Sequence, residues 1–291
     1  MSAPPTNIVR QGLPSRSALR VATLRAVHAL LDEPRVLVDD LALPLLGATT
    51  ADALRDDPFA LNDPLSRGLR AALVVRSRFF EDELARGVAA GVRQCVVLGA
   101  GLDTLAYRHP HAHQGLTVFE VDHPATQGWK QRLLDEAGIA RPATLRFVPA
   151  DFECDDVAAA LKRAGFQPDQ PACVSWMGVT LYLTRAAVHQ TLALVAGFAP
   201  GSSLCFDYRL PDAQLNPIER LLNQVIEQQM AAQGEPWLSS FDPVELRQTL
   251  IALGFSSAET ATPDLLNARY FARRKDGLRT GGGACIMRAL K

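Results

Sequence analysis

The sequence has no apolar run that approaches the roughly 20 residues needed to span a bilayer. It also has no excess of either charge, because its formal net charge is −1 over 291 residues. No long-range field therefore draws it toward nucleic acid or anionic lipid, and we expect neither partner. Pro4, Pro5 and Asn7 stand where a signal peptide has its apolar core, which favours a cytoplasmic location.

The five cysteines form no C-x-x-C pair and show no metal-ligand spacing. Most of them fall in apolar segments, so we expect buried, reduced thiols and no disulfide framework. His109, His111 and His113 alternate and could share one face of an extended loop around a metal. Because no further ligand is close in sequence, a solvated loop is the preferred interpretation, and the sequence predicts no metal site.

Short apolar runs alternate with helical patterns through the middle of the chain, and this alternation predicts a doubly wound α/β fold. Near-continuous apolar runs are typical of parallel strands that are covered on both faces. The predicted strands are Cys95–Gly101, Leu116–Asp122, Leu145–Asp151, Ala172–Gly178 and Ser202–Tyr208, with two more within Phe255–Thr262 and Ala284–Leu290.

The helical patterns predict one domain over residues 1–291, with an N-terminal helical cap in 1–90 and a Rossmann-like core in 91–291. The cap holds helices over 17–31 and 69–89, separated by a proline-broken stretch. Within the core, a further helix near 212–235 interrupts the strand–helix alternation and is interpreted as an insertion. A helix after Asp242 has the strongest start signal, with Asp, Pro and Glu in capping order.

Ligands of open parallel sheets bind at the carboxyl ends of the strands, so these ends hold the candidate site. Gly99-Ala100-Gly101 follows the first strand, and its glycines would let a ligand approach the backbone closely, although a tight turn without ligand also fits. Glu120 and Asp122 lie about 20 residues further on, where an acid can bind ribose hydroxyls. Asp122 could instead cap the helix that starts at Pro124.

Two cofactors are compatible with this arrangement, a nicotinamide dinucleotide and S-adenosylmethionine. A dinucleotide loop needs a small residue three positions after Gly101, where this chain has Thr104. Asp103 would also lie beside a doubly negative pyrophosphate and repel it. S-adenosylmethionine carries a cationic sulfonium and an ammonium group instead, so Asp103 is tolerable or helpful beside it. Asp151-Phe152, after the third strand, could hold an adenine ring or begin the next helix.

Four segments occur in an order that resembles the leucine carboxyl methyltransferase family and related bacterial S-adenosylmethionine-dependent methyltransferases. They are VVLGAGLDTLAYR (96–108), FEVDHPATQGWK (119–130), FVPADFE (147–153) and WMGVTLYL (176–183). RSRFFEDEL (76–84) and the tail DGLRTGGGACIMRA are similar as well, so the resemblance covers about residues 15–290.

The resemblance implies a class I methyltransferase fold with seven strands, the last of them antiparallel, and S-adenosylmethionine as cofactor. It assigns Gly99 and Gly101 to the methionine part, and Asp122 with Glu120 beside it to the nucleoside. It assigns Asp151 and Phe152 to the adenine, and Arg76 to the cofactor's carboxylate, where an arginine fork matches well. A solvated helix arginine is the alternative for Arg76.

One position departs from the family, because many relatives carry a glutamate where this chain has Met177. A thioether cannot replace a carboxylate, so either the cofactor amine has another partner, Asp103 or a backbone carbonyl, or the substrate differs. We expect methyl transfer to a carboxyl or hydroxyl oxygen of a small molecule or a protein C-terminus. No catalytic base is assigned among Tyr182, Asp207, Tyr208 and Arg209, and Arg209 or Arg78 could hold an acidic acceptor. The alternatives are an NAD(P)-dependent oxidoreductase and a non-catalytic relative.

Overall fold

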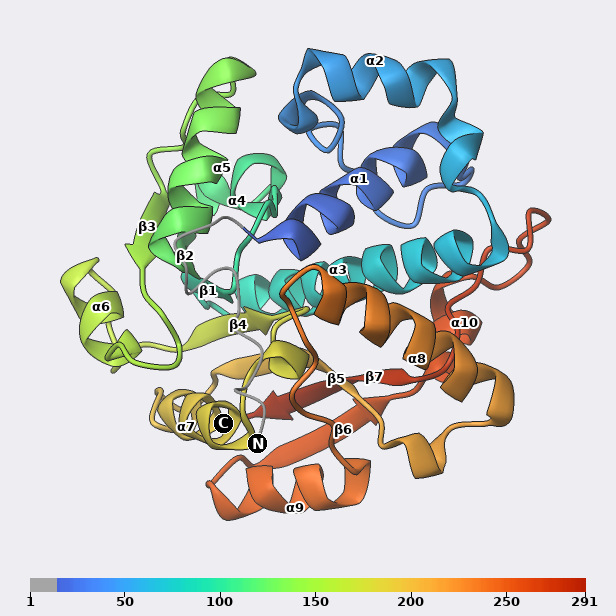
Figure 1. Ribbon diagram of the computed structural model, residues 1–291. Helices are drawn as coiled ribbons and strands as arrows, with labels where there is room; N and C mark the ends of the chain where they lie inside the picture. Colours follow the sequence, from blue (N-terminus) through green and yellow to red (C-terminus); the bar gives the residue numbers. More distant parts are fainter. Residues whose placement is uncertain (1–14) are drawn as a thin grey trace.

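The computed structural model describes residues 15–291, so Pro4, Pro5 and Asn7 lie outside the described part of the chain. Within that part, seven strands form one sheet in the order β3-β2-β1-β4-β5-β7-β6 (Figure 1). The strands are β1 (Gln94–Leu98), β2 (Thr117–Asp122), β3 (Leu145–Pro149), β4 (Ala172–Trp176), β5 (Ser203–Arg209), β6 (Ser257–Ala261) and β7 (Ala284–Leu290). Only β7 runs antiparallel to its neighbours, which confirms the predicted fold class.

Helices cover both faces of the sheet, as the apolar strands require. Alternate residues of each strand point to opposite faces, and in β1 Val96 and Leu98 pack on one side while Cys95 and Val97 pack on the other. One face carries α3 (Pro64–Ala89), α4 (Leu105–Arg108), α5 (Pro124–Glu136) and α10 (Pro263–Tyr270). The other carries α6 (Val157–Arg163), α7 (Arg185–Ala196) and α9 (Pro243–Ala252).

The cap helices α1 (Arg16–Leu31) and α2 (Ala48–Asp56) lie outside α3 (Figure 1). They form a separate apolar cluster, in which Ala22 and Val27 of α1 pack with Leu102 of the loop after β1 and Leu134 of α5. The cap is therefore packed directly against the segment that follows the first strand. No helix within residues 15–291 is long and apolar enough to cross a membrane.

Two helix starts differ from the sequence prediction. Helix α3 begins at Pro64, five residues before the predicted start, and Asp63 caps it by accepting the N–H groups of Leu65 and Ser66 at 3.0 Å. Proline is tolerated in the first helical turn, so Pro64 begins this helix and does not break it. Helix α10 was not predicted, although Thr262-Pro263 gives it the same kind of start.

Helix α8 (Pro217–Ala232) lies between β5 and α9, within the 212–235 stretch that is interpreted from sequence as an inserted helix. Asn216 and Glu219 form a capping box at its start. The helix crosses β5 and β7 near their site-forming ends (Figure 1), and Arg209 at the end of β5 pairs with Glu227 of α8 at 3.2 Å. The insertion therefore stands over the edge of the sheet where a ligand is expected.

Candidate functional site

A cavity of about 760 Å³ runs along the carboxyl ends of the strands. It includes the ends of β1 and β4, where the strand order reverses and where open α/β sheets bind their ligands. Six of the seven predicted cofactor residues line it, namely Arg76, Gly99, Gly101, Asp122, Asp151 and Phe152. The seventh, Glu120, is not among the lining residues.

The loop after β1 contains two glycines that no other residue could replace without strain. Gly99 has φ +68° and Gly101 has φ +49°, in the left-handed region that side chains rarely adopt. A Cβ on Gly99 would lie 2.2 Å from Cγ2 of Val179, and one on Gly101 would lie 3.2 Å from Cβ of Ala18. Both positions therefore require glycine, because Val179 and Ala18 pack closely against the loop where it borders the cavity.

The loop's amides are occupied by strand β2. Gly99 and Ala100 both donate to the carbonyl of Val121, at 2.8 and 3.1 Å, and Gly101 donates to the carboxylate of Asp122. A pyrophosphate site uses free amides at such a turn, followed by the positive end of a helix. Here three amides are taken and the following helix, α4, has only four residues, so the loop is poorly suited to phosphate.

Asp122 ends β2 at the cavity. Its carboxylate also accepts the N–H of His123 at 2.7 Å, and burial raises its pKa above the ordinary value despite these two backbone donors. Helix α5 is capped by His123, whose ring accepts the N–H of Ala125 at 3.2 Å. Asp122 is thus not the helix cap, and its side chain is placed to hold the glycine loop and face the cavity.

Glu120 lies deeper in the same strand, and the structure does not bring it to the cavity. Residues two apart on a strand share a face but are about 6.6 Å apart along it. At that depth the Glu120 carboxylate lies beneath α5, where it pairs with the ammonium of Lys130 at 2.6 Å and both side chains are 1% exposed. Burial raises its pKa, although Lys130 opposes the rise.

Asp151 and Phe152 follow β3 and line the far end of the cavity. Asp151 accepts the N–H of Glu153 at 2.9 Å and so shapes the turn after the strand. The cap of α6 is Asp156, which accepts the N–H of Ala159 at 2.9 Å. The alternative that Asp151 begins the next helix is therefore wrong for this fold.

Arg76 reaches the cavity from α3 and is not a solvated helix arginine, because its side chain is 15% exposed. Its guanidinium pairs with Asp207, at the end of β5, at 2.8 Å. Asp207 also accepts the N–H of Gly178, whose φ is +76°. A Cβ on Gly178 would lie 2.5 Å from Nη2 of Arg76, so the arginine is held between a glycine backbone and a carboxylate.

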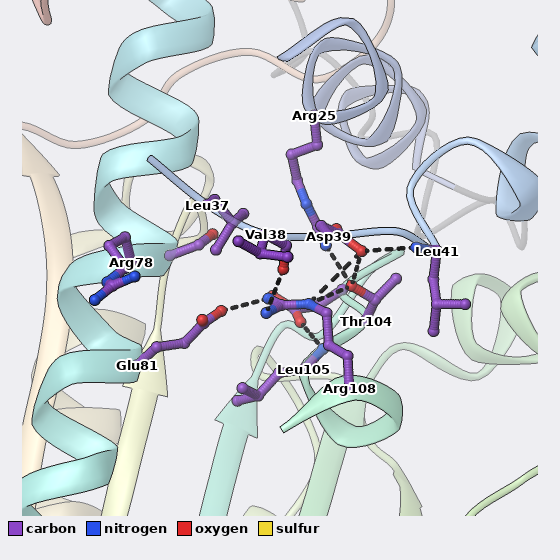
Figure 2. Close-up of polar contacts among 12 residues, drawn as sticks. Arg25, Leu37, Val38, Asp39, Leu41, Arg78, Glu81, Thr104, Leu105 and Arg108 are labelled. Carbon is purple, nitrogen blue, oxygen red and sulfur yellow. Dashed lines mark hydrogen bonds and ion pairs between the residues drawn. The ribbon is translucent and has the colours of Figure 1, made fainter. Parts of the chain in front are cut away.

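A buried polar network ties the cap to the end of the glycine loop (Figure 2). Arg25 of α1 pairs with Asp39, and the hydroxyl of Thr104 donates to Asp39 at 2.8 Å. Arg108 of α4 donates to that hydroxyl at 2.9 Å and pairs with Glu81 of α3. Arg25 and Asp39 are almost fully buried. The network fixes Thr104, and with it the last turn of the loop.

Asp103, next to Thr104 of this network, lines the cavity. Burial alone would raise its pKa, but the charges of Arg25, Arg108 and Lys130 outweigh burial and lower it. One of its oxygens accepts the N–H of Leu105 at 2.6 Å. An ionised carboxylate therefore stands next to the glycine loop.

The sequence matches the leucine carboxyl methyltransferase family over residues 18–196. It is 32% identical over 293 residues to the "Putative S-adenosyl-L-methionine-dependent methyltransferase YktD" of Bacillus subtilis, covering 93% of this chain and 95% of the relative. A Mycobacteroides abscessus protein named "Putative S-adenosyl-L-methionine-dependent methyltransferase" is 34% identical over 224 residues, covering 75% and 70%. The chain belongs to the leucine carboxyl methyltransferase family. It is an S-adenosylmethionine-dependent methyltransferase, with S-adenosylmethionine as its cofactor.

Solved structures share the fold of this methyltransferase. A "putative methyltransferase" of Thermobifida fusca superposes with a TM-score of 0.59 at 18% identity, over 100% of this chain and 99% of the other. A DUF574 family protein of Streptomyces avermitilis gives 0.56 at 17% identity, over 80% and 90%. Both likenesses concern the arrangement of the sheet and its helices.

The other candidate residues of the methyltransferase lie at the β4 and β5 end of the cavity. Met177, Tyr182, Asp207, Tyr208 and Arg209 all line it. Burial raises the pKa of Tyr182, so its hydroxyl keeps its proton at neutral pH. Arg78 is not a lining residue; its side chain is 44% exposed and pairs with Asp82 at 2.8 Å. Of the two arginines considered for an acidic acceptor, only Arg209 reaches the cavity.

Several lining residues were not identified from sequence. They include Ser15, Ser17, Glu235 and Trp237 near the cap, Leu222, Ile226 and Met230 of α8, and Gly281–Gly283 before β7. The three consecutive glycines could have been recognised as a close approach of the backbone. Glu235 carried no local signal, because its partners are more than 200 residues away. Within residues 15–291, no three His, Cys, Asp or Glu side chains are grouped to hold a metal.

Proposed function

We propose that this methyltransferase transfers the methyl group of S-adenosylmethionine to a carboxyl or hydroxyl oxygen, on a small molecule or a protein C-terminus. The cofactor part of the proposal rests on the convergence of six predicted cofactor residues, from distant parts of the sequence, on one cavity at the switch point. The oxygen acceptor is supported by the match to the leucine carboxyl methyltransferase family. Asp151 and Phe152 would hold the adenine, and Asp122 the ribose hydroxyls. Gly99 and Gly101 would border the methionine part.

The two ends of the cofactor's amino-acid group need opposite charges. Arg76 would bind its carboxylate, since a partly buried guanidinium fork is well matched to that group. Asp103 would bind its ammonium, because its lowered pKa keeps it ionised. Met177 has no charge to offer, and Asp103 therefore supplies the role that a glutamate has in many relatives.

Bound S-adenosylmethionine would supply an activated methyl group, so the chain's own task is to align donor and acceptor and to exclude water. A carboxylate acceptor is already nucleophilic and needs no base, whereas a hydroxyl must lose its proton during transfer. The dinucleotide alternative has less support, because β2 occupies three amides of the glycine loop. A non-catalytic relative would bind cofactor poorly or turn nothing over.

Calorimetry with S-adenosylmethionine, S-adenosylhomocysteine and NAD tests the cofactor. We expect the first two to bind and NAD to give no heat, and the reverse result would contradict the proposal. Transfer of a labelled methyl group from S-adenosylmethionine to molecules of a cell extract then tests the activity. Mild base releases the label from a methyl ester but not from a methyl ether. Label that stays on nitrogen or carbon, or no label at all, would contradict transfer to oxygen.

A further inference from the structure

The cavity extends well beyond the residues proposed for the cofactor. Those residues lie at the ends of β3, β2 and β1 and on the adjoining α3, whereas the cavity continues past β4 to Tyr208 on β5 and Ile286 on β7. Neighbouring strands are about 4.8 Å apart, so β2 and β7 are separated by about 19 Å across four intervals. The β5 and β7 end has room for a second molecule, and its walls indicate what that molecule is.

We propose that the methyl acceptor is a small, predominantly apolar molecule that binds between α3, α8 and the glycine-rich segment before β7, and that α8 selects it. This inference rests on the proposed function, since it names the substrate class of the same cavity. The walls at this end are formed by Leu69 and Leu73 of α3, Leu222 and Ile226 of α8, Leu266 of α10 and Ile286 of β7. Apolar surface of this kind binds apolar ligands by removing both from water.

Arg209 is the charged side chain of this wall that could attract an acidic acceptor, and it already has two acidic partners. It binds Asp212 at 2.6 Å and Glu227 at 3.2 Å, both through Nη2. Arg20 is a further lining arginine, but it meets Gln229 in an exposed setting on the cap side. A peptide's terminal carboxylate at Arg209 would lie beside the carboxylates of Asp212 and Glu227, whose like charge opposes it. A molecule whose only polar group is the reacting one avoids that cost.

Helix α8 is held tightly against the segment before β7. A Cβ on Gly282 would lie 1.8 Å from the carboxylate of Glu219, and one on Gly283 would lie 2.6 Å from the amide of Asn223. The helix therefore rests on bare backbone at this end of the sheet, with Leu222 and Ile226 on its cavity side. This contact makes α8 a wall of the acceptor site and leaves little space for a peptide chain to pass beneath it.

The rim of the cavity is apolar as well. Leu222 of α8 and Leu238 of the following loop both line the cavity and remain 40% and 48% exposed. Ile218 and Leu221 continue the apolar surface along α8, with 72% and 61% of their surface exposed. Such a stripe next to an opening suits the entrance of an apolar molecule.

The test uses 1-naphthol, a compact apolar probe with one hydroxyl, titrated by fluorescence into the full chain saturated with S-adenosylhomocysteine. We expect saturable binding at one site per chain, weakened at least tenfold by Ile226→Arg and changed less than twofold by Ile226→Leu. Gln224→Arg is the matched control, because it adds the same charge to an exposed position of the same helix that does not line the cavity. All three variants should bind S-adenosylhomocysteine as the parent does.

The two proposals fail in different ways. If the parent chain does not bind S-adenosylhomocysteine, the proposed function is wrong, and this inference with it. If that ligand binds but 1-naphthol does not saturate, or if Gln224→Arg weakens naphthol binding as much as Ile226→Arg, only the acceptor site is wrong. A tripeptide with a free C-terminal leucine that binds more tightly than naphthol, and is sensitive to Ile226→Arg, would also overturn it in favour of a protein acceptor.

Discussion

Ser17, at the start of α1, donates its backbone N–H to the carboxylate of Glu235 at 2.7 Å, across 218 residues of sequence. The hydroxyl of Ser15 donates to the other oxygen of the same carboxylate, also at 2.7 Å. Glu235 is 3% exposed, and all three residues line the cavity. One buried side chain therefore joins the N-terminal cap to the loop after α8 at the wall of the cavity.

Glu235→Ala should destabilise the protein and loosen the cap. The substitution leaves the Ser17 N–H without a partner, and an unsatisfied buried donor costs about 1–3 kcal/mol. Urea unfolding measures the loss, and amide exchange of Ser17 should accelerate more than exchange in the central strands. Glu235→Gln keeps one accepting oxygen and should lose less. Unchanged exchange at Ser17 in the alanine variant would show that the contact does not hold the cap.

Asp122 should make cofactor binding depend on pH. Charge-assisted hydrogen bonds contribute about 1.5–3 kcal/mol, so Asp122→Asn should weaken S-adenosylhomocysteine roughly ten- to a hundredfold. Because burial raises the pKa of Asp122, its carboxylate is protonated at a higher pH than an exposed aspartate, and affinity should fall on acidification through that raised value. Calorimetry against pH measures this, and the asparagine variant should lack the Asp122 component of the slope.

Protonation of Asp122 should raise the folding stability of the ligand-free protein, although it lowers the affinity for the cofactor. Where the folded pKa of a carboxyl is raised, the native state binds the proton more tightly than the unfolded chain. The contribution of Asp122 to the stability of the ligand-free protein therefore increases as the pH falls through the raised pKa of its carboxyl, while cofactor affinity decreases. Comparison of urea unfolding for parent and Asp122→Asn isolates it. An affinity that increases on acidification would contradict the ribose assignment.

Arg76 and Asp207 should act as a unit on the cofactor's carboxylate. Arg76→Lys loses the fork geometry and should weaken S-adenosylhomocysteine about tenfold or more. Asp207→Asn removes the charge that positions the guanidinium, and should have a smaller effect in the same direction. 5′-Methylthioadenosine, which has no amino-acid carboxylate, is the control ligand, and its affinity should be nearly unchanged in both variants. Equal losses for the two ligands would mean that the pair only supports the fold.

The strand ends were predictable because a buried parallel strand and the polar residue that ends it are both local patterns. Gly99, Asp122 and Asp151 each follow such a run, and parallel pairing brings their ends to one edge. The contacts between the N-terminal cap and the loop after α8 were not predictable. The contact between Ser17 and Glu235 depends on how the cap and the insertion pack over the sheet, and no spacing in the sequence encodes it.

Glu120 shows a second limit of sequence interpretation, and it gives the last prediction. Its distance from the cavity depends on where β2 stops and on α5 lying above it, so it pairs with Lys130 instead of facing the cofactor. Lys130→Met leaves a buried carboxylate unpaired and should destabilise the fold by about 3–5 kcal/mol. The double variant Glu120→Gln/Lys130→Met removes both charges and should recover much of that loss in urea unfolding. The affinity of the double variant for S-adenosylhomocysteine should equal that of the parent. A large loss of affinity in a double variant that has recovered its stability would show that Glu120 contributes to cofactor binding.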